Sequence, residues 1–216
     1  MPSYRGIMFD LDGTLADTLP DIVAAANHAV TSVGLLAISV EQCRELVGFG
    51  PRHLIAGALG DGATEEQISS AIQHFRDYYA ERGLDFVKPY PGIPELLTTL
   101  QDRGMVLSVL SNKPDPAVHQ VASHLFAPGI FHVIQGACDA YPLKPDPTAA
   151  RTVAATAGLP AEAIAYVGDT AVDIETGHAA GMLAVGVTWG FRDREELSGA
   201  GADVIIDHPS ELLKHI

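Results

Sequence analysis

The chain has 216 residues and a formal net charge of −14; apolar residues make up 47% of it and charged residues 19%. This composition predicts a folded globular protein with one sizeable core, or with a core and a small second domain, and excludes a disordered chain. The acidic balance argues against nucleic acid and anionic membranes as partners, and the two cysteines lack a metal-ligand spacing.

The first predicted element is a buried strand at residues 6–9, a short apolar run that ends at Asp10. The residues before it do not have the pattern of a signal peptide, and no apolar run reaches the roughly 20 residues that span a bilayer. We therefore expect a cytoplasmic protein without a membrane partner, which also fits two cysteines that lie far apart in the sequence.

Residues 17–83 show helical periodicity and no convincing strand. Three pairs of residues have the spacing of helix capping boxes: Thr18 and Asp21, Ser39 and Gln42, and Thr64 and Gln67. The first of these helices is expected to stop at Gly34. This part of the chain is thus predicted to be an α-helical insert.

Strands and helices alternate after residue 88. Strands are predicted at residues 105–110, 131–135, 163–167, 183–187 and 204–206, and helices at residues 93–103, 114–126, 145–157 and 171–180. Such alternation predicts an α/β fold, a doubly wound parallel sheet with helices on both faces. We expect a core domain of residues 1–16 and 88–216, with a helical cap domain of residues 17–87 inserted.

Four polar clusters lie at residues 10–14, 111–113, 144–147 and 168–173, and three of them directly follow predicted strands. Ligands of open parallel sheets bind at the carboxyl ends of the strands, so the clusters are expected to converge. Asp10 and Asp12 point the same way in an extended segment and, with Asp169, offer the hard oxygen ligands that Mg²⁺ prefers. Taken singly, each cluster also fits a turn, a helix cap or a surface charge.

The runs MFDLDGTLADT, LSNKP, KPDP and VGDTAVDI closely resemble, in this order, the four motifs of the haloacid dehalogenase superfamily. The SNKP and KPDP forms are similar to those of phosphoglycolate-phosphatase-type members. The resemblance implies a Rossmann-like core with an inserted cap and a Mg²⁺-dependent phosphatase that works through an aspartyl-phosphate intermediate. The expected partner is a small phosphorylated metabolite, above all 2-phosphoglycolate, cleaved to glycolate and phosphate.

The resemblance also implies roles for individual residues. Asp10 matches the nucleophile and Asp12 the general acid and base. Ser111 and Lys144 match catalytic positions that bind phosphate. The metal would be held by Asp10, the Asp12 backbone carbonyl, Asp169 and Asp173. Other substrate-binding positions are Thr14 and Asn112 in the core and Gly48, Phe49 and Arg52 in the cap.

Two alternatives stay open. A sugar-phosphate mutase of the same superfamily, similar to β-phosphoglucomutase, would share the acidic residues and the metal. A phospho-receiver module also combines acidic residues, a hydroxyl and a lysine, although its phosphorylated aspartate comes later in the chain. The cap segment with Gly48 and Arg52 equally fits a plain helix–helix turn and a surface arginine. The alcohol half of the substrate and the choice between monomer and homodimer are not set by the sequence.

Overall fold

The computed structural model describes residues 4–216, and its chain divides into two compact units. The core unit holds the chain up to Ala16 and from Pro89 to Ile216, and the cap unit runs from Asp17 to Lys88. The chain passes between them through two short strands, β2 (Ala16–Asp17) and β3 (Lys88–Pro89), which pair with each other.

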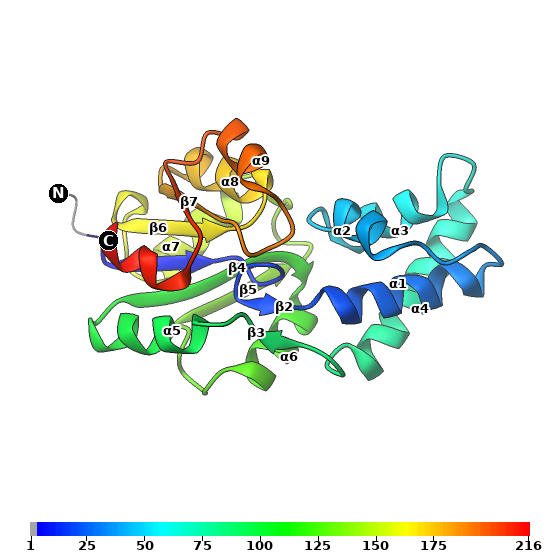
Figure 1. Cartoon of the computed structure of the whole chain (residues 1–216), viewed down its shortest axis with the longest axis horizontal. Coiled ribbons are helices and arrows are strands. Elements are labelled where there is room, and N and C mark those ends of the chain that lie inside the picture. The colour runs from blue at the N-terminus through cyan, green and yellow to red at the C-terminus, as the bar shows by residue number, and fades with distance from the viewer. Residues whose placement is uncertain (1–3) are drawn as a thin grey trace. The chain divides into compact units, whose positions relative to one another are not determined.

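The core unit is built on a six-stranded parallel sheet in the order β5-β4-β1-β6-β7-β8 (Figure 1). The strands are β1 (Gly6–Phe9), β4 (Val106–Pro114), β5 (Val133–Ala137), β6 (Ile164–Gly168), β7 (Leu183–Val187) and β8 (Val204–Ile206). Every strand predicted from the sequence is present. Strand β4 stays extended to Pro114, beyond its apolar run, and β5 begins and ends two residues later than predicted.

The helices of the core unit lie on both faces of this sheet. They are α5 (Ile93–Asp102), α6 (Asp115–Leu125), α7 (Thr148–Thr156), α8 (Ala171–Ala180) and α9 (Arg194–Gly199), with 3₁₀ turns η1 (Ala161–Ala163) and η2 (Pro209–Lys214). Parallel strands are joined by right-handed crossovers, so the reversal of strand order after β5 places α5 and α6 opposite α7, α8 and α9 (Figure 1). The predicted doubly wound α/β fold is confirmed.

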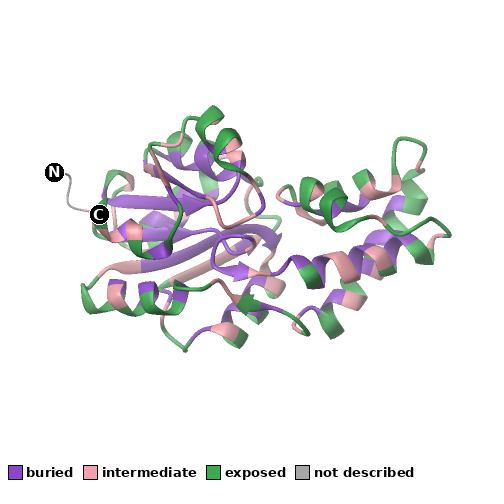
Figure 2. Ribbon diagram, in the orientation of Figure 1, coloured by how far each residue is buried: buried purple, intermediate pink, exposed green. Residues whose placement is uncertain are grey.

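Strand β1 lies at the centre of the sheet and is buried along its whole length (Figure 2). Met8 packs in one hydrophobic cluster with Leu110 of β4 and Tyr166 of β6. Burial of such a side chain contributes about 1.5–3 kcal/mol, so the apolar run is held firmly in register. Phe9 pairs with Val109 on one side and Val167 on the other, which fixes where the next residue, Asp10, leaves the sheet.

The cap unit consists of four helices: α1 (Leu19–Ser32), α2 (Val40–Leu46), α3 (Gly50–Leu59) and α4 (Glu65–Arg82). Helix α1 packs along α4, and α2 and α3 lie against them. The capping boxes predicted at Ser39 and Thr64 are present, with both reciprocal hydrogen bonds. No helix within residues 4–216 has the length and apolar character needed to cross a membrane.

The capping box predicted at Thr18 and Asp21 is wrong. Thr18 has helical backbone angles (φ −103°, ψ −5°) and its side chain makes no capping hydrogen bond. The Asp21 carboxylate instead accepts a hydrogen bond from the backbone N–H of Phe86 at 3.1 Å. A carboxylate in the first turn therefore ties the end of the cap segment to the start of α1.

Candidate active site

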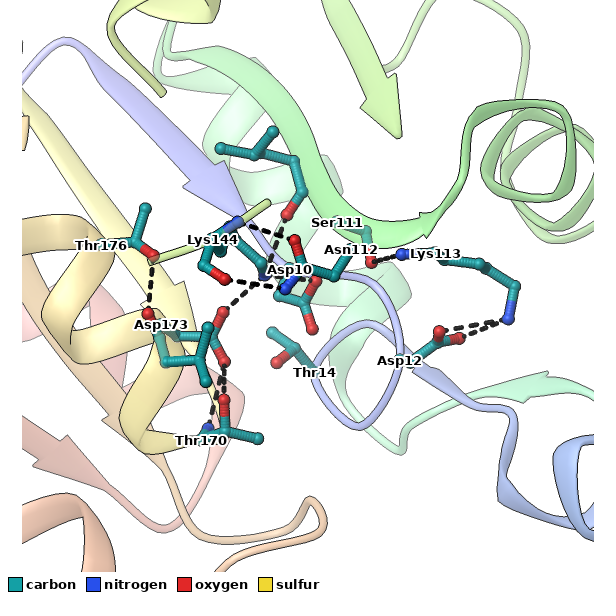
Figure 3. A network of polar contacts seen from close by, with 12 residues as sticks. Asp10, Asp12, Thr14, Ser111, Asn112, Lys113, Lys144, Thr170, Asp173 and Thr176 are labelled. Atoms are coloured by element: carbon teal, nitrogen blue, oxygen red, sulfur yellow. Dashed lines mark hydrogen bonds and ion pairs between the residues drawn. The ribbon is translucent and has the colours of Figure 1, made fainter. Parts of the chain in front are cut away.

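The candidate active site lies at the carboxyl ends of β1, β4 and β6, where the strand order reverses direction. Asp10 follows β1, Ser111 belongs to the end of β4, and Asp169 follows β6. Lys144 enters from the loop between β5 and α7, and Asp173 from the first turn of α8. The four polar clusters singled out in the sequence thus meet at one edge of the sheet, as expected (Figure 3).

Lys144 links two of the acidic residues. Its Nζ lies 2.9 Å from Oδ1 of Asp10 and 2.7 Å from Oδ1 of Asp173, and it also donates to the Leu110 carbonyl at 3.3 Å. The ammonium group sits 5.7 Å from the centre of the Tyr166 ring. All three charged side chains are buried, so these contacts act in a region of low dielectric and fix the carboxylates firmly.

The charges of this cluster are not balanced by protein groups. Burial, with repulsion from Asp173 and Asp12, raises the pKa of Asp10 from 3.8 to about 6, although the Lys144 ammonium opposes the rise. Burial and the neighbouring carboxylates of Asp173 and Asp10 raise the pKa of Asp169 well above its usual range. For Lys144, burial disfavours the charge, but the attraction of Asp10 and Asp173 outweighs it and raises its pKa.

The surplus of negative charge fits a divalent cation. Asp10, Asp169 and Asp173 each offer a carboxylate oxygen, and these oxygens lie within 4.8 Å of one another. The ligand set contains oxygen only, which suits Mg²⁺ better than a metal that prefers nitrogen or sulfur. The three side chains therefore suit a Mg²⁺ site. The expected ligation by the Asp12 backbone carbonyl stays a prediction.

Asp169 is held from two sides by hydrogen bonds to the protein. The Thr14 hydroxyl donates to Oδ1 at 2.9 Å and the Phe191 backbone N–H donates to Oδ2 at 2.7 Å. Thr14 was expected to bind substrate, and the structure shows that it contacts this acidic residue. Gly13 and Gly190 flank the carboxylate so closely that a Cβ atom on either would collide with Asp169.

Asp173 is fixed by the start of its own helix. Its Oδ2 accepts hydrogen bonds from the backbone N–H of Thr170 at 3.1 Å and from the Thr170 hydroxyl at 2.7 Å. Its Oδ1 is thereby directed toward Lys144. Asp173 is therefore both a capping group of α8 and an ion-pair partner of Lys144. A place at the start of a helix and a place in the candidate site are compatible.

Asp12 points toward a second lysine (Figure 3). Nζ of Lys113 donates to both carboxylate oxygens of Asp12, at 3.0 and 3.1 Å, and little of either side chain is exposed. Lys113 had no predicted role, although it belongs to the SNKP run. Its position within that run, directly after Ser111 and Asn112, was the available signal.

Asn112 positions the loop that carries Lys144. Its side-chain amide donates to the Lys144 carbonyl at 3.1 Å and accepts from the Lys144 N–H at 2.8 Å. Ser111 is buried beside it and accepts a hydrogen bond from the Lys113 N–H at 3.4 Å. Pro114 is the N-cap residue of α6, so Ser111 is not the cap of that helix. Phosphate binding by Ser111 stays a prediction.

A loop after β7 was missed as part of the site. Trp189 donates from Nε1 to the Thr14 carbonyl at 3.0 Å, and Phe191 supplies the N–H on Asp169. The sequence suggested only packing for both aromatic residues. Trp189 contacts a residue 175 positions earlier in the chain, and Phe191 contacts one 22 positions earlier. Contacts between residues so far apart in the sequence leave no local sequence pattern.

The predicted substrate-binding residues of the cap unit lie around the start of α3. Gly48 has φ +127°, and Phe49 is 44% exposed and stacks at a tilt on His53, with ring centres 5.0 Å apart. Arg52 lies in α3 and forms an exposed pair with Glu65 of α4, with Nη2 2.7 Å from Oε2. Substrate binding by these residues stays a prediction.

Comparisons with known proteins identify the family of the chain. A family model described as haloacid dehalogenase-like hydrolase matches residues 7–187. The chain is 35% identical to the phosphoglycolate phosphatase of Vibrio parahaemolyticus, with 96% of this chain and 94% of that protein covered. It is 31% identical to the N-acetylmuramic acid 6-phosphate phosphatase of Pseudomonas aeruginosa, with 97% and 93% covered.

A solved structure shows the same fold over the whole chain. It is that of a protein from Lactobacillus delbrueckii subsp. bulgaricus for which phosphoglycolate phosphatase activity has been suggested. The TM-score is 0.94 at 30% sequence identity, and the match covers 99% of this chain and 98% of that one. Because the family model matches most of the chain and these relatives align over nearly their whole length, the chain belongs to the haloacid dehalogenase-like hydrolase family.

Proposed function

We propose that the protein is a Mg²⁺-dependent phosphatase of small phosphate monoesters that carry a carboxylate, with 2-phosphoglycolate as the first candidate. The observation that carries the proposal is the cluster in which Lys144 bridges Asp10 and Asp173 beside Asp169. It combines a fixed carboxylate nucleophile with a cation for phosphate. The relatives named above are phosphatases, which supports the reaction class.

The proposed reaction begins at Asp10. Lys144 holds Oδ1 of Asp10 and so orients its carboxylate. A carboxylate oxygen attacks phosphorus, the bond between phosphorus and the ester oxygen breaks, and Asp12 donates a proton to the departing alkoxide. This yields an aspartyl phosphate on Asp10 and the free alcohol. Bound Mg²⁺ would neutralise charge on the transferring phosphoryl group and keep Asp10 ionised.

The second half of the reaction returns the enzyme to its starting state. Asp12, now a carboxylate, accepts a proton from a water molecule while that water attacks phosphorus. The bond between phosphorus and Asp10 breaks, and inorganic phosphate leaves. General acid and base catalysis of this kind contributes about 10²- to 10⁴-fold. The pairing of Asp12 with Lys113 keeps the carboxylate in a defined orientation between the two steps.

The substrate class is supported by what two relatives act on. One acts on phosphoglycolate and one on N-acetylmuramic acid 6-phosphate. The two alcohols differ greatly in size, but both substrates carry a carboxylate in addition to the phosphate. A cation of the protein should recognise that group.

The test is a turnover screen with Mg²⁺. We expect higher kcat/KM for 2-phosphoglycolate and N-acetylmuramic acid 6-phosphate than for p-nitrophenyl phosphate, and no turnover by Asp10→Asn. β-Glucose 1-phosphate should release phosphate slowly and form no glucose 6-phosphate. Appreciable hydrolysis by folded Asp10→Asn protein would overturn the nucleophile assignment. Formation of glucose 6-phosphate with a bisphosphate activator would make the protein a mutase.

A further inference from the structure

Lys113 is a buried cation that takes part in no bond-making or proton-transfer step of the proposed reaction. Among the residues described, the buried lysines and arginines are Lys113 and Lys144. Lys144 sits on the phosphate side, between Asp10 and Asp173. Lys113 sits on the other side of the site, with Nζ 3.0 Å from Asp12. The two buried cations therefore serve different parts of any ester bound there.

The part of the ester next to Lys113 is the leaving group. Asp12 has to reach the ester oxygen to protonate it, so a group beside Asp12 is also beside the first atoms of the alcohol. In 2-phosphoglycolate, a single methylene carbon separates the ester oxygen from the carboxylate. The Lys113 ammonium lies within 3.1 Å of both Asp12 oxygens, so it lies on the side of the site where that carboxylate would be.

The chemistry of the lysine suits this task. An ammonium group can bridge two carboxylates, because its N–H bonds diverge tetrahedrally. Little of the Lys113 side chain is exposed, so its charge is weakly screened and favours a second anion nearby. Lys113 lies near the end of β4, where the pairing with β5 is irregular, and it follows the buried residues Ser111 and Asn112.

We propose that Lys113 is a specificity-determining residue that binds the carboxylate of the substrate next to its ester oxygen. This inference rests on the proposed function, since it names the group that recognises the leaving alcohol. The protein should therefore prefer esters whose alcohol carries a negative charge one carbon from the ester oxygen. It should reject those with a positive charge at the same place, because an ammonium would face Lys113.

The test uses three esters of nearly equal size: 2-phosphoglycolate, 2-hydroxyethyl phosphate and O-phosphoethanolamine. Their terminal groups are negative, neutral and positive. We expect kcat/KM to fall in that order for the natural protein. Lys113→Met should lower the ratio of 2-phosphoglycolate to 2-hydroxyethyl phosphate by about 10- to 100-fold, the range for a lost hydrogen bond to a charged group.

Two further variants separate recognition from structure. Lys113→Arg keeps the charge and should retain most of the preference. Lys214→Met removes one charge from an exposed side chain of η2 and should leave the ratio unchanged. Lys113 also holds Asp12, so Lys113→Met should slow all three esters. A loss that is equal for the three esters would show that Lys113 acts only through Asp12, and would overturn the proposal.

A binding measurement keeps this result distinct from the reaction itself. In an Asp10→Asn background without turnover, calorimetry with Mg²⁺ should show tighter binding of 2-phosphoglycolate than of 2-hydroxyethyl phosphate, and Lys113→Met should abolish the difference. If that holds but the natural protein hydrolyses no ester, the proposed function fails and the carboxylate site stands. If 2-phosphoglycolate is hydrolysed rapidly but the preference does not depend on Lys113, the phosphatase stands and this inference fails.

Discussion

Replacing Asp10 by asparagine should make the metal-free protein more stable at neutral pH, although it abolishes turnover. Burial and the carboxylates of Asp173 and Asp12 raise the pKa of Asp10 from 3.8 to about 6, even with Lys144 beside it. One pKa unit corresponds to 1.36 kcal/mol, so ionised Asp10 costs the folded state about 3 kcal/mol. Asparagine keeps the shape of the side chain and has no charge to bury.

The effect has a defined dependence on pH. Folded protein binds the Asp10 proton more tightly than unfolded protein does, so this contribution to stability is fully present below pH 3.8 and is lost as the pH rises through about 6. The asparagine variant does not titrate there. Its stability gain over the natural protein should be close to zero at pH 3.5 to 4 and reach about 3 kcal/mol above pH 7. In a chain of this size, that is about 6–12 °C in Tm.

The assay is thermal unfolding between pH 4 and pH 8 in the presence of a chelator, followed by circular dichroism. Asp102→Asn, in an exposed position at the end of α5, is the matched control and should change Tm little at any pH. Added Mg²⁺ should narrow the gap, because binding to the carboxylates stabilises the natural protein by mass action. An Asp10→Asn variant that is less stable than the natural protein at pH 8 in chelator would refute the electrostatic argument.

Three other results are expected. Gly190→Ala places a Cβ against Asp169 and Gly13, so it should destabilise the protein by about 1–3 kcal/mol and weaken Mg²⁺ binding measured by calorimetry; unchanged affinity would contradict the close contact. Lys144→Met leaves the Asp10 carboxylate buried without its partner and should cost about 3–5 kcal/mol in denaturant unfolding at pH 8, but much less at pH 4. Chelation should stop phosphate release, Mg²⁺ should restore it, and the larger Ca²⁺ should inhibit by spoiling the attack geometry; full activity after exhaustive chelation would exclude a metal requirement.

The sheet could be predicted because its strands are buried on both faces. Residues 6–9 and 183–187 are continuous apolar runs bounded by polar or turn residues, and both form strands with those limits. The end of β4 was predicted less well, because Ser111, Asn112 and Lys113 are polar yet remain extended and buried. Polar residues inside a strand carry no apolar signal, and here they belong to the candidate site.

Local capping chemistry was readable where the partners lie three residues apart. Ser39 and Thr64 each bond to a glutamine within the same turn, as the sequence indicates. Thr18 and Asp21 have the same spacing, but Asp21 finds its partner at Phe86, 65 positions along the chain. Helix α9 was also missed, because it is only six residues long and has too few turns to show periodicity.

Some residues of the candidate site could be predicted from the sequence, and others could not. The acidic residues and Lys144 lie in recognisable motifs, so their convergence could be expected. The partners that hold them could not: Phe191 contacts Asp169 through its backbone N–H, which any residue other than proline would offer. The pairing of Lys113 with Asp12 spans 101 positions and depends on the adjacency of β1 and β4.

Trp189 is the single tryptophan of the chain. Its indole N–H bonds to the carbonyl of Thr14, whose hydroxyl bonds to Asp169, so the fluorophore is two hydrogen-bonded contacts from a proposed metal ligand. All tryptophan emission of this protein therefore comes from the edge of the candidate site, without background from elsewhere. Intrinsic fluorescence can follow ion binding and phosphoryl transfer in a stopped-flow instrument with unlabelled protein, and quenching by iodide can report how solvent reaches the loop.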